Sequence, residues 1–313
     1  MKCTFKVSIV GVGKVGATAA YAMCLNGTPT DMVLVAHRKE TAEAEKLDLE
    51  HALPFLQNIN IVATDKYEDV SGSDLIVVTA GAAQKPDQTR LDLVKENLLI
   101  FNDIIPKIYA ASPDSIVLIV TNPVDILTYH SSKLAPFKFG QIFGSGTLLD
   151  TARFRFHLSE MFKVNPRSIH AYVLGEHGDH SFPALSSAHI SGQTITQFPG
   201  YTEEKVMSAF TETQQAAYTI IKSKGATYYA IATAIMKLMN AIYSDAKSIL
   251  PVSVPLMDMH GVSDMALSVP CVVGQAGVEQ VITLPFSDQE KTQFTLAANT
   301  LKEAYLNGKD KTV

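Results

Sequence analysis

Cysteine and positive charge are both scarce in this sequence. Its three cysteines, Cys3, Cys24 and Cys271, are widely spaced in 313 residues and form no Cys-x-x-Cys pair. This pattern disfavours a disulfide framework and a zinc site, so we expect buried or idle thiols and no metal. The formal net charge is −5, which leaves no basic footprint for binding nucleic acid.

Long apolar runs are also missing. The basic N-terminus is followed by an apolar run of only about six residues before glycines break it, which is too short for a signal peptide. No stretch approaches the roughly 18 apolar residues of a membrane span. With 47% hydrophobic and 18% charged residues, the chain can bury a large core. We therefore expect a globular, cytoplasmic protein with no membrane partner.

Strand-like and helix-like segments alternate in the first half of the chain. The strand-like runs are apolar and rich in β-branched residues, and they cover residues 5–10, 32–35, 75–79, 116–120 and 141–143. Helical stretches separate them, and this alternation predicts right-handed crossovers and a parallel sheet. We expect an α/β fold that opens with a doubly wound, dinucleotide-binding (Rossmann) domain over residues 1–145.

The second half has a mixed pattern, which predicts an α+β domain over residues 146–313. The expected elements are a helix at 149–162, a strand at 169–173, a helical region at 203–243 broken near Gly225, and strands within 252–256 and 266–284. A last helix should begin at Ser287, where Ser-Asp-Gln-Glu matches a capping box. There is no Pro/Gly-rich linker and no internal repeat, so the two domains should be closely joined.

A glycine-rich loop follows the first predicted strand. Gly11, Gly13 and Gly16 form Gly-x-Gly-x-x-Gly. The first glycine permits a tight turn, the second lets the backbone approach a pyrophosphate, and the third lets helix and strand pack closely. The N-terminus of the next helix attracts phosphate charge. We therefore predict that this loop, including Val15, binds a dinucleotide and is not merely a structural turn.

The end of the second predicted strand bears on which dinucleotide binds. An NAD-binding domain usually places Asp or Glu there to hold the adenosine ribose. This chain has Ala36 at that position, followed by His37 and Arg38. Without the carboxylate a 2′-phosphate is not repelled, and Arg38 can contact it. Our hypothesis is that NADP is accepted or preferred; the alternative is that Arg38 is only solvated and NAD binds through its pyrophosphate.

Four side chains suit the oxidation of a 2-hydroxy acid, which needs a base, a cation for the carboxylate and a polar group at the carbonyl. His177 lies between glycines and would titrate near ~6.5 if unperturbed. Asp150 and Arg153 share a helix face and could orient the imidazole and clamp the carboxylate. Taken alone, they suggest an ordinary ion pair. Arg90 ends a Gly- and Pro-containing loop that suits a lid or an ordinary surface loop.

Together, the motifs resemble the L-lactate/malate dehydrogenase family, and essentially the whole chain looks most like bacterial L-lactate dehydrogenase. The motifs occur in family order and are Gly-Val-Gly-Lys-Val-Gly, Gly-Ala-Ala-Gln-Lys-Pro-Asp-Gln-Thr-Arg, Thr-Asn-Pro-Val-Asp, Leu-Asp-Thr-Ala-Arg-Phe-Arg and Gly-Glu-His-Gly-Asp. The resemblance implies that His177 is the acid/base and that Asp150 orients it. It also implies that Arg153 grips the substrate carboxylate and that Arg90 closes over the carbonyl.

The resemblance also implies how the substrate is selected. Asn122, which precedes a proline that is commonly cis in the family, would contact substrate or nicotinamide, and Thr227 would line the pocket. Gln84 matches the main substrate selector, where a malate enzyme carries arginine for the second carboxylate of oxaloacetate. A neutral glutamine suits the methyl group of pyruvate, because burying an unpaired carboxylate is costly. We therefore favour L-lactate dehydrogenase; malate dehydrogenase and a broader L-2-hydroxy-acid dehydrogenase are the alternatives.

Arg155 and His170 match positions where allosteric bacterial lactate dehydrogenases bind fructose 1,6-bisphosphate between subunits. Arg155 points to a different helix face from Arg153. Two subunits would each offer an arginine and a histidine, forming an anion site on a two-fold axis. Packing without an effector explains these residues nearly as well. The family also suggests a homotetramer.

Two other classes of protein are less consistent with the sequence. A nucleotide-dependent glycosidase with a related dinucleotide domain would need a metal-binding Cys/His set, which we do not find. A non-catalytic dinucleotide sensor would not need His177, Asp150, Arg153 and Arg90 together. The segment Ala36-His37-Arg38 departs from the family pattern and puts strict NAD dependence in doubt.

Overall fold

The first half of the chain forms a parallel sheet between layers of helices. The computed structural model describes residues 4–82 and 90–309. Parallel strands lie in the order β3-β2-β1-β4-β5-β6. Their bounds are β1 Lys6–Val10, β2 Asp31–Val35, β3 Asn60–Thr64, β4 Leu75–Val78, β5 Ile116–Ile119 and β6 Ile142–Gly144. The helices are α1 Lys14–Asn26, α2 Lys39–Ala52, α3 Arg90–Ala111 and α4 Val124–Leu134.

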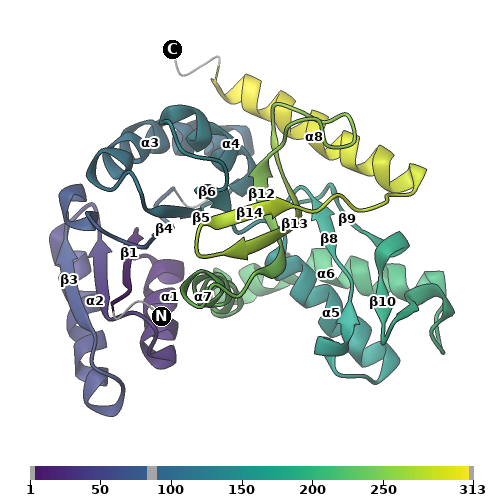
Figure 1. Ribbon diagram of the computed structural model, residues 1–313, viewed down its shortest axis with the longest axis horizontal. Coiled ribbons are helices and arrows are strands. Elements are labelled where there is room, and N and C mark those ends of the chain that lie inside the picture. Colours follow the sequence, from purple (N-terminus) through teal and green to yellow (C-terminus); the bar gives the residue numbers. More distant parts are fainter. Residues whose placement is uncertain (1–3, 83–89, 310–313) are drawn as a thin grey trace.

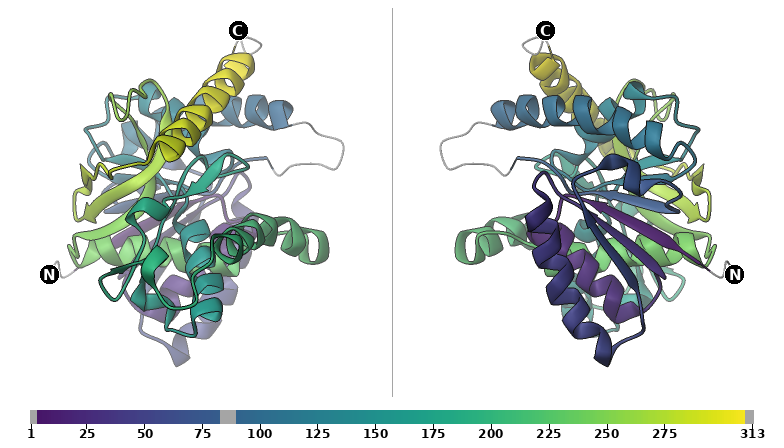
Figure 2. Two further views of the ribbon diagram at one scale, coloured as in Figure 1. Left: turned by 90° about the vertical axis from the view of Figure 1, so that its right-hand side faces the viewer. Right: turned by 90° about the vertical axis from the view of Figure 1, so that its left-hand side faces the viewer.

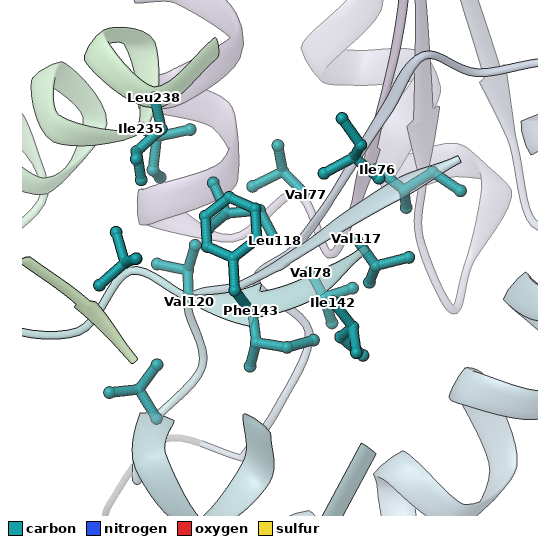
Figure 3. Close-up of a cluster of buried hydrophobic side chains, with 14 of the residues drawn as sticks. Ile76, Val77, Val78, Val117, Leu118, Val120, Ile142, Phe143, Ile235 and Leu238 are labelled. Atoms are coloured by element: carbon teal, nitrogen blue, oxygen red, sulfur yellow. The ribbon is translucent and has the colours of Figure 1, made fainter. Parts of the chain in front are cut away.

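The core lies where the central strands are covered on both faces. Figure 1 shows α3 and α4 on one side of β4, β5 and β6, with α1 and α7 (Tyr229–Tyr243) on the other. The strands β4 and β5 read Leu-Ile-Val-Val and Ile-Val-Leu-Ile and are buried throughout. Such continuous apolar runs are expected when both faces of a parallel sheet are covered. In Figure 3, Leu118 and Phe143 of the sheet lie toward Ile235 and Leu238 of α7.

The second half extends the same sheet with antiparallel strands. β12 pairs with β6, and the order continues through β13, β8 and β9, with β14 beside β13, to give eleven strands. These strands are β8 Val173–Gly175, β9 Ser181–Pro183, β12 Ser248–Pro255, β13 Ala266–Gly274 and β14 Gly277–Val281. A small sheet holds β7 Ile169–His170, β10 His189–Ile190 and β11 Gln193–Thr194. The remaining helices are α5 Leu148–Phe162, α6 Glu203–Lys224 and α8 Asp288–Lys309.

The fold class predicted from the sequence is confirmed. The expected division after residue 145 lies between β6 and α5, and the pairing of β12 with β6 carries one sheet across it. Single turns of 3-10 helix complete the fold, at Leu53–Phe55, Tyr67–Val70, Pro166–Ser168, Leu185–Ser187 and Ile195–Gln197. Among the described helices, none combines the length and the apolar character needed to cross a bilayer.

Two details of the predicted strands were wrong. The edge strand β3 was not predicted, because Asn60–Thr64 is a short run with a polar residue at each end. The stretch 169–173, predicted as one strand, is two short ones: β7 pairs with β10 in the small sheet, whereas β8 pairs with β13 and β9 in the large sheet. The chain thus changes sheets within this stretch.

Local signals at the helix ends were correct. The backbone N–H of Ser287 donates to Glu290 Oε2 at 2.8 Å, and the N–H of Glu290 donates to Ser287 Oγ at 3.2 Å, which is the predicted capping box. Gly225 has a φ of 82° and ends α6, as the predicted break requires. The helix α8 (yellow in Figure 2) lies beside α3 at the C-terminal end of the chain.

Candidate active site

The glycine loop is built from strand β1, helix α1 and the end of β4. Gly11 has a φ of 98°, and a Cβ there would lie 2.4 Å from the Ala80 nitrogen. A Cβ on Gly16 would lie 2.0 Å from the Gly11 carbonyl oxygen. At Gly13, by contrast, a Cβ would meet no described atom within 4 Å, and the residue is exposed. The chain's own packing therefore requires two of the three glycines, and the third leaves open backbone where a ligand can approach.

Helix α1 offers an N-terminus suited to a pyrophosphate. Its N-cap is Gly13, which has no side chain to cap the first-turn N–H groups, and the first turn carries no acidic residue. These N–H groups and the helix dipole favour an anion. The residues present therefore fit a dinucleotide. Lys14, the first residue of α1, lies across from the α6–α7 turn, since its Nζ is 3.7 Å from where a Gly225 Cβ would be.

Ala36 and Arg38 lie at the same edge of the sheet as the glycine loop. The Gly11 N–H donates to Val35 O at 2.8 Å, which joins the loop to the end of β2. Ala36 follows β2 and is half-buried, whereas Arg38 is exposed at the start of α2. The nearest acidic residue in sequence is Glu40, which lies in the first turn of α2 and is exposed.

His177, Asp150 and Arg153 lie together. The Asp150 Oδ2 atom is 2.5 Å from His177 Nδ1, and Asp150 Oδ1 accepts a hydrogen bond from an Arg153 NH group at 3.1 Å. Asp150 and Arg153 come from one face of α5, and His177 follows β8, which packs against α5. The Asp150 and Arg153 side chains are only 13% and 12% exposed, so their contact is not an ordinary surface ion pair.

The electrostatics of this group favour a charged imidazole. Burial lowers the pKa of His177, but the charge and hydrogen bond of Asp150, with a further contribution from Asp125, raise it to about 9. Burial raises the pKa of Asp150, but the His177 ring and then Arg153 outweigh this, and the net shift is downward. At neutral pH the pair is therefore an imidazolium beside a carboxylate, able to give up a proton from Nε2.

A cavity of about 520 Å³ opens beside these residues. Its lining includes Asn122, Asp150, Arg153 and His177. The helices α3, α6 and α8 add polar side chains such as Glu303, together with the apolar side chains of Leu93, Ile221, Leu301 and Ala304. An apolar cavity with a few convergent polar groups is typical of a small-molecule site. The Asn122–Pro123 bond is cis, as the family resemblance implies.

Three of the predicted site residues are not seen at this cavity. Gln84 falls outside the described residues. Arg90 is the first residue of α3, and its side chain is not described. Thr227 is half-buried in the turn between α6 and α7 and does not line the cavity.

Arg155 and His170 lie on the far side of α5 and on the small sheet. The Arg155 Nε–H donates to Ala171 O at 2.8 Å, and its guanidinium lies 5.2 Å from the Tyr172 ring centre. Burial lowers the pKa of Arg155. His170 is exposed, and Ala171 is its neighbour in sequence, so the two predicted effector residues lie close in the chain's own packing.

Sequence reasoning missed two buried residues of the site. Asn97, on α3, is 0% exposed; its Oδ1 accepts from the Ala82 N–H at 2.7 Å and its Nδ2 donates to Asn122 O at 2.8 Å. Asp125 is 2% exposed and accepts from the His177 N–H at 2.7 Å. Asp125 belongs to the Thr-Asn-Pro-Val-Asp motif, which was the one available signal.

The cysteine and metal predictions concern groups away from this cavity. Cys24 and Cys271 are free and buried, and burial raises the thiol pKa values to about 11 and about 12. Within residues 4–82 and 90–309, no three His, Cys, Asp or Glu side chains gather to hold a metal ion.

Comparisons with known proteins agree with this geometry. Residues 5–144 match the family model of the lactate/malate dehydrogenase NAD-binding domain, and residues 147–312 match that of the α/β C-terminal domain. The chain is 46% identical over 302 residues to an L-lactate dehydrogenase of Thermoanaerobacter sp. (strain X514), covering 95% of this chain and 97% of that enzyme. It is 41% identical over 309 residues to L-lactate dehydrogenase 1 of Clostridium acetobutylicum, covering 97% and 98%.

Two crystal structures have a similar fold. One is a lactate dehydrogenase from a Medee basin deep-sea metagenome, with a TM-score of 0.93, 34% identity and coverage of 97% of this chain and 99% of that one. The other is a minor L-lactate dehydrogenase of Enterococcus mundtii in a ligand-bound form, with a TM-score of 0.93, 37% identity and coverage of 97% and 98%.

Proposed function

The chain belongs to the lactate/malate dehydrogenase family, and on that basis we propose that it is an L-lactate dehydrogenase, interconverting pyruvate and L-lactate with a nicotinamide cofactor. The observation that carries this proposal is the 2.5 Å contact between His177 Nδ1 and Asp150 Oδ2, with Arg153 lining the same cavity. The relatives named L-lactate dehydrogenase, at 40–46% identity, support it.

A nicotinamide cofactor held by the glycine loop and the N-terminus of α1 would supply or accept the hydride, and this chain's residues handle the proton and the carboxylate. Asp150 holds the Nδ1–H of His177, which leaves Nε2 as the atom that gives a proton to the pyruvate carbonyl oxygen or takes it back from lactate. Arg153 binds the substrate carboxylate. Arg90, the first residue of α3, is proposed to polarise the carbonyl on closure.

The test is a reduction assay with pyruvate and both reduced cofactors, compared with a His177→Gln variant. We expect turnover by the wild-type protein and a loss of at least about 100-fold in kcat for the variant. Full activity in the variant would contradict the role of His177. No turnover with either cofactor would favour a non-catalytic dinucleotide-binding protein.

We infer that NADP(H) is accepted alongside NAD(H). Ala36 replaces the ribose-binding carboxylate at the end of β2, and Arg38 is exposed beside it. Comparing kcat/KM for NADH and NADPH is the direct measurement. An Ala36→Asp variant should move the ratio toward NADH by at least about tenfold, because the new carboxylate repels a 2′-phosphate. A strong NADH preference in the wild-type protein would contradict the inference.

Gln84 supports pyruvate as the substrate and opposes oxaloacetate. A Gln84→Arg variant should raise the use of oxaloacetate relative to pyruvate, because arginine can pair with the second carboxylate. If the ratio of oxaloacetate use to pyruvate use did not change, Gln84 would not be the residue that selects the substrate. Assays with longer 2-oxo acids give the breadth of the substrate range.

We also propose that fructose 1,6-bisphosphate binds Arg155 and His170 in a homotetramer. Activation by the bisphosphate in the kinetic assay, lost in an Arg155→Gln variant, is the expected result. Arg155 already donates to Ala171 O, so packing alone is the competing role. If saturating bisphosphate left the rate of pyruvate reduction unchanged, the effector proposal would fail and packing would be the remaining role of Arg155.

A further inference from the structure

Asp125 is a buried carboxylate that contacts His177 from a second element. It lies in the first turn of α4, is 2% exposed, and its Oδ2 accepts from the His177 peptide N–H at 2.7 Å. Asp150, by contrast, contacts the His177 ring. His177 is therefore held at its ring by α5 and at its backbone by α4.

The other oxygen of this carboxylate lacks a hydrogen bond in the described part of the chain. Asp125 Oδ1 and the hydroxyl of Ser253, on β12, are both buried, and neither forms a hydrogen bond of good geometry there. The Ser253 hydroxyl is nevertheless close enough to lower the pKa of Asp125. An unpaired buried carboxylate oxygen costs free energy. An asparagine would accept the same His177 N–H without a buried charge. The presence of aspartate therefore indicates that the negative charge itself has a use.

That charge faces His177. Burial, and to a smaller extent Glu176, raises the pKa of Asp125 to about 6, against the lowering effects of Ser253, the His177 N–H and the His177 ring. At pH 7 the carboxylate is thus mainly ionised. It contributes to the raised pKa of His177, after Asp150.

Few other charged groups surround His177 in the part of the chain that the structure describes. On α5 they are Asp150 and Arg153; after β8 they are Glu176 and Asp179; and on the cavity wall α8 adds Glu303. Glu176 Oε2 accepts from the His180 N–H at 3.2 Å. β12 presents only the neutral Ser253. Of these carboxylates, only Asp125 and Asp150 bond directly to His177 within the described residues.

We propose that Asp125 is a positioning residue for the reaction, whose Oδ2 fixes the His177 backbone and whose buried charge helps to hold the proton on the His177 imidazole. This inference rests on the proton-transfer role proposed for His177. A merely structural Asp125 would act only as a hydrogen-bond acceptor, and an amide oxygen would replace it fully.

Two variants separate the charge from the hydrogen bond. Asp125→Asn keeps an oxygen for the His177 N–H and removes the charge; Asp125→Ala removes both. Ser131→Ala is the matched control, because it removes a buried hydroxyl from the same helix, α4, without changing charge. The measurement is the pH dependence of kcat/KM for pyruvate reduction. Reduction requires a protonated His177, so kcat/KM falls as pH rises through the pKa of His177.

We expect the alkaline fall of Asp125→Asn to move to lower pH by about one unit, with the low-pH plateau within a few-fold of wild type. The alkaline fall of Asp125→Ala should shift by a similar amount. Its plateau value of kcat/KM should also be at least about tenfold lower, because the backbone of His177 is no longer held by a hydrogen bond. Ser131→Ala should leave the profile unchanged. An Asp125→Asn profile that superimposes on the wild type would overturn the proposal, as would an equal shift in Ser131→Ala.

A second measurement does not depend on turnover. NMR titration of histidine-labelled protein, with His177 assigned by its absence in His177→Gln, gives the imidazole pKa directly. We expect it to fall in Asp125→Asn, and an unchanged value would overturn the proposal. This result stands even if pyruvate is not the substrate, so failure of the inference and failure of the proposed function are distinguishable.

Discussion

Replacing Asp150 by asparagine tests the source of the His177 proton affinity. With Asp150 present, the pKa of His177 is about 9; without its charge, burial should leave the pKa at or below the ordinary 6.5. At pH 8 a group with a pKa of 9 is about 90% protonated, whereas one with a pKa of 6.5 is about 3% protonated. Pyruvate reduction at pH 8 should therefore fall by about 30-fold from protonation alone.

The loss should depend on pH in a defined direction. At pH 6 the variant imidazole would still be about three-quarters protonated, so the loss there should shrink to the cost of lost orientation. Lactate oxidation, which needs the neutral imidazole, should begin at lower pH in the variant than in the wild type. The wild-type rate of reduction should fall only as pH rises through about 9.

The assay is the initial rate of pyruvate reduction from pH 5.5 to 10, expressed as kcat/KM at saturating reduced cofactor. The control is Glu160→Gln, which removes an exposed carboxylate from the same helix and should leave the profile unchanged. If Asp150→Asn lost the same factor at pH 6 and at pH 8, then Asp150 would act only by orienting the ring. The reasoning from charge would then be refuted.

Three further predictions concern stability and cofactor binding. Folding raises the pKa of Asp125 from 3.8 to about 6, so the stability that its protonated form contributes is lost as pH rises through 6. Asp125→Asn lacks this carboxylate. Its free energy of unfolding at pH 7, measured by urea denaturation, should therefore exceed that of the wild type by up to about 3 kcal/mol. A destabilised variant would contradict this. Gly16→Ala should lower the free energy of unfolding by about 1–3 kcal/mol, because the new Cβ would lie 2.0 Å from Gly11 O. Gly13→Ala should keep the melting temperature of the wild type and weaken cofactor binding. Equal melting temperatures for the two alanine variants would refute the distinction. Glu290→Ala should cost about 1 kcal/mol, because it removes the acceptor of the part-buried N–H groups of Ser186 and Ser287, with Glu290→Gln as the milder control.

Local sequence determined much of the fold and part of the site. The capping box at Ser287, the helix end at Gly225 and the tight turn at Gly11 depend on residues a few positions apart, so spacing alone predicts them. The alternation of apolar strands and helices likewise predicts the parallel sheet. The edge strand β3 was not predicted, because a run of five residues with polar ends carries little periodic signal.

Only tertiary packing brought the site together. His177 lies 27 residues from Asp150 and 52 from Asp125, and no local spacing relates these positions. The pairing of β12 with β6, which makes one sheet of both halves, depends on which edge is left open after the parallel strands have formed. Residue types and the family resemblance predicted that His177 and Asp150 act together, and the fold places their side chains in contact. The backbone contact of Asp125 had to await the fold, because a buried carboxylate acquires its role from the groups that surround it.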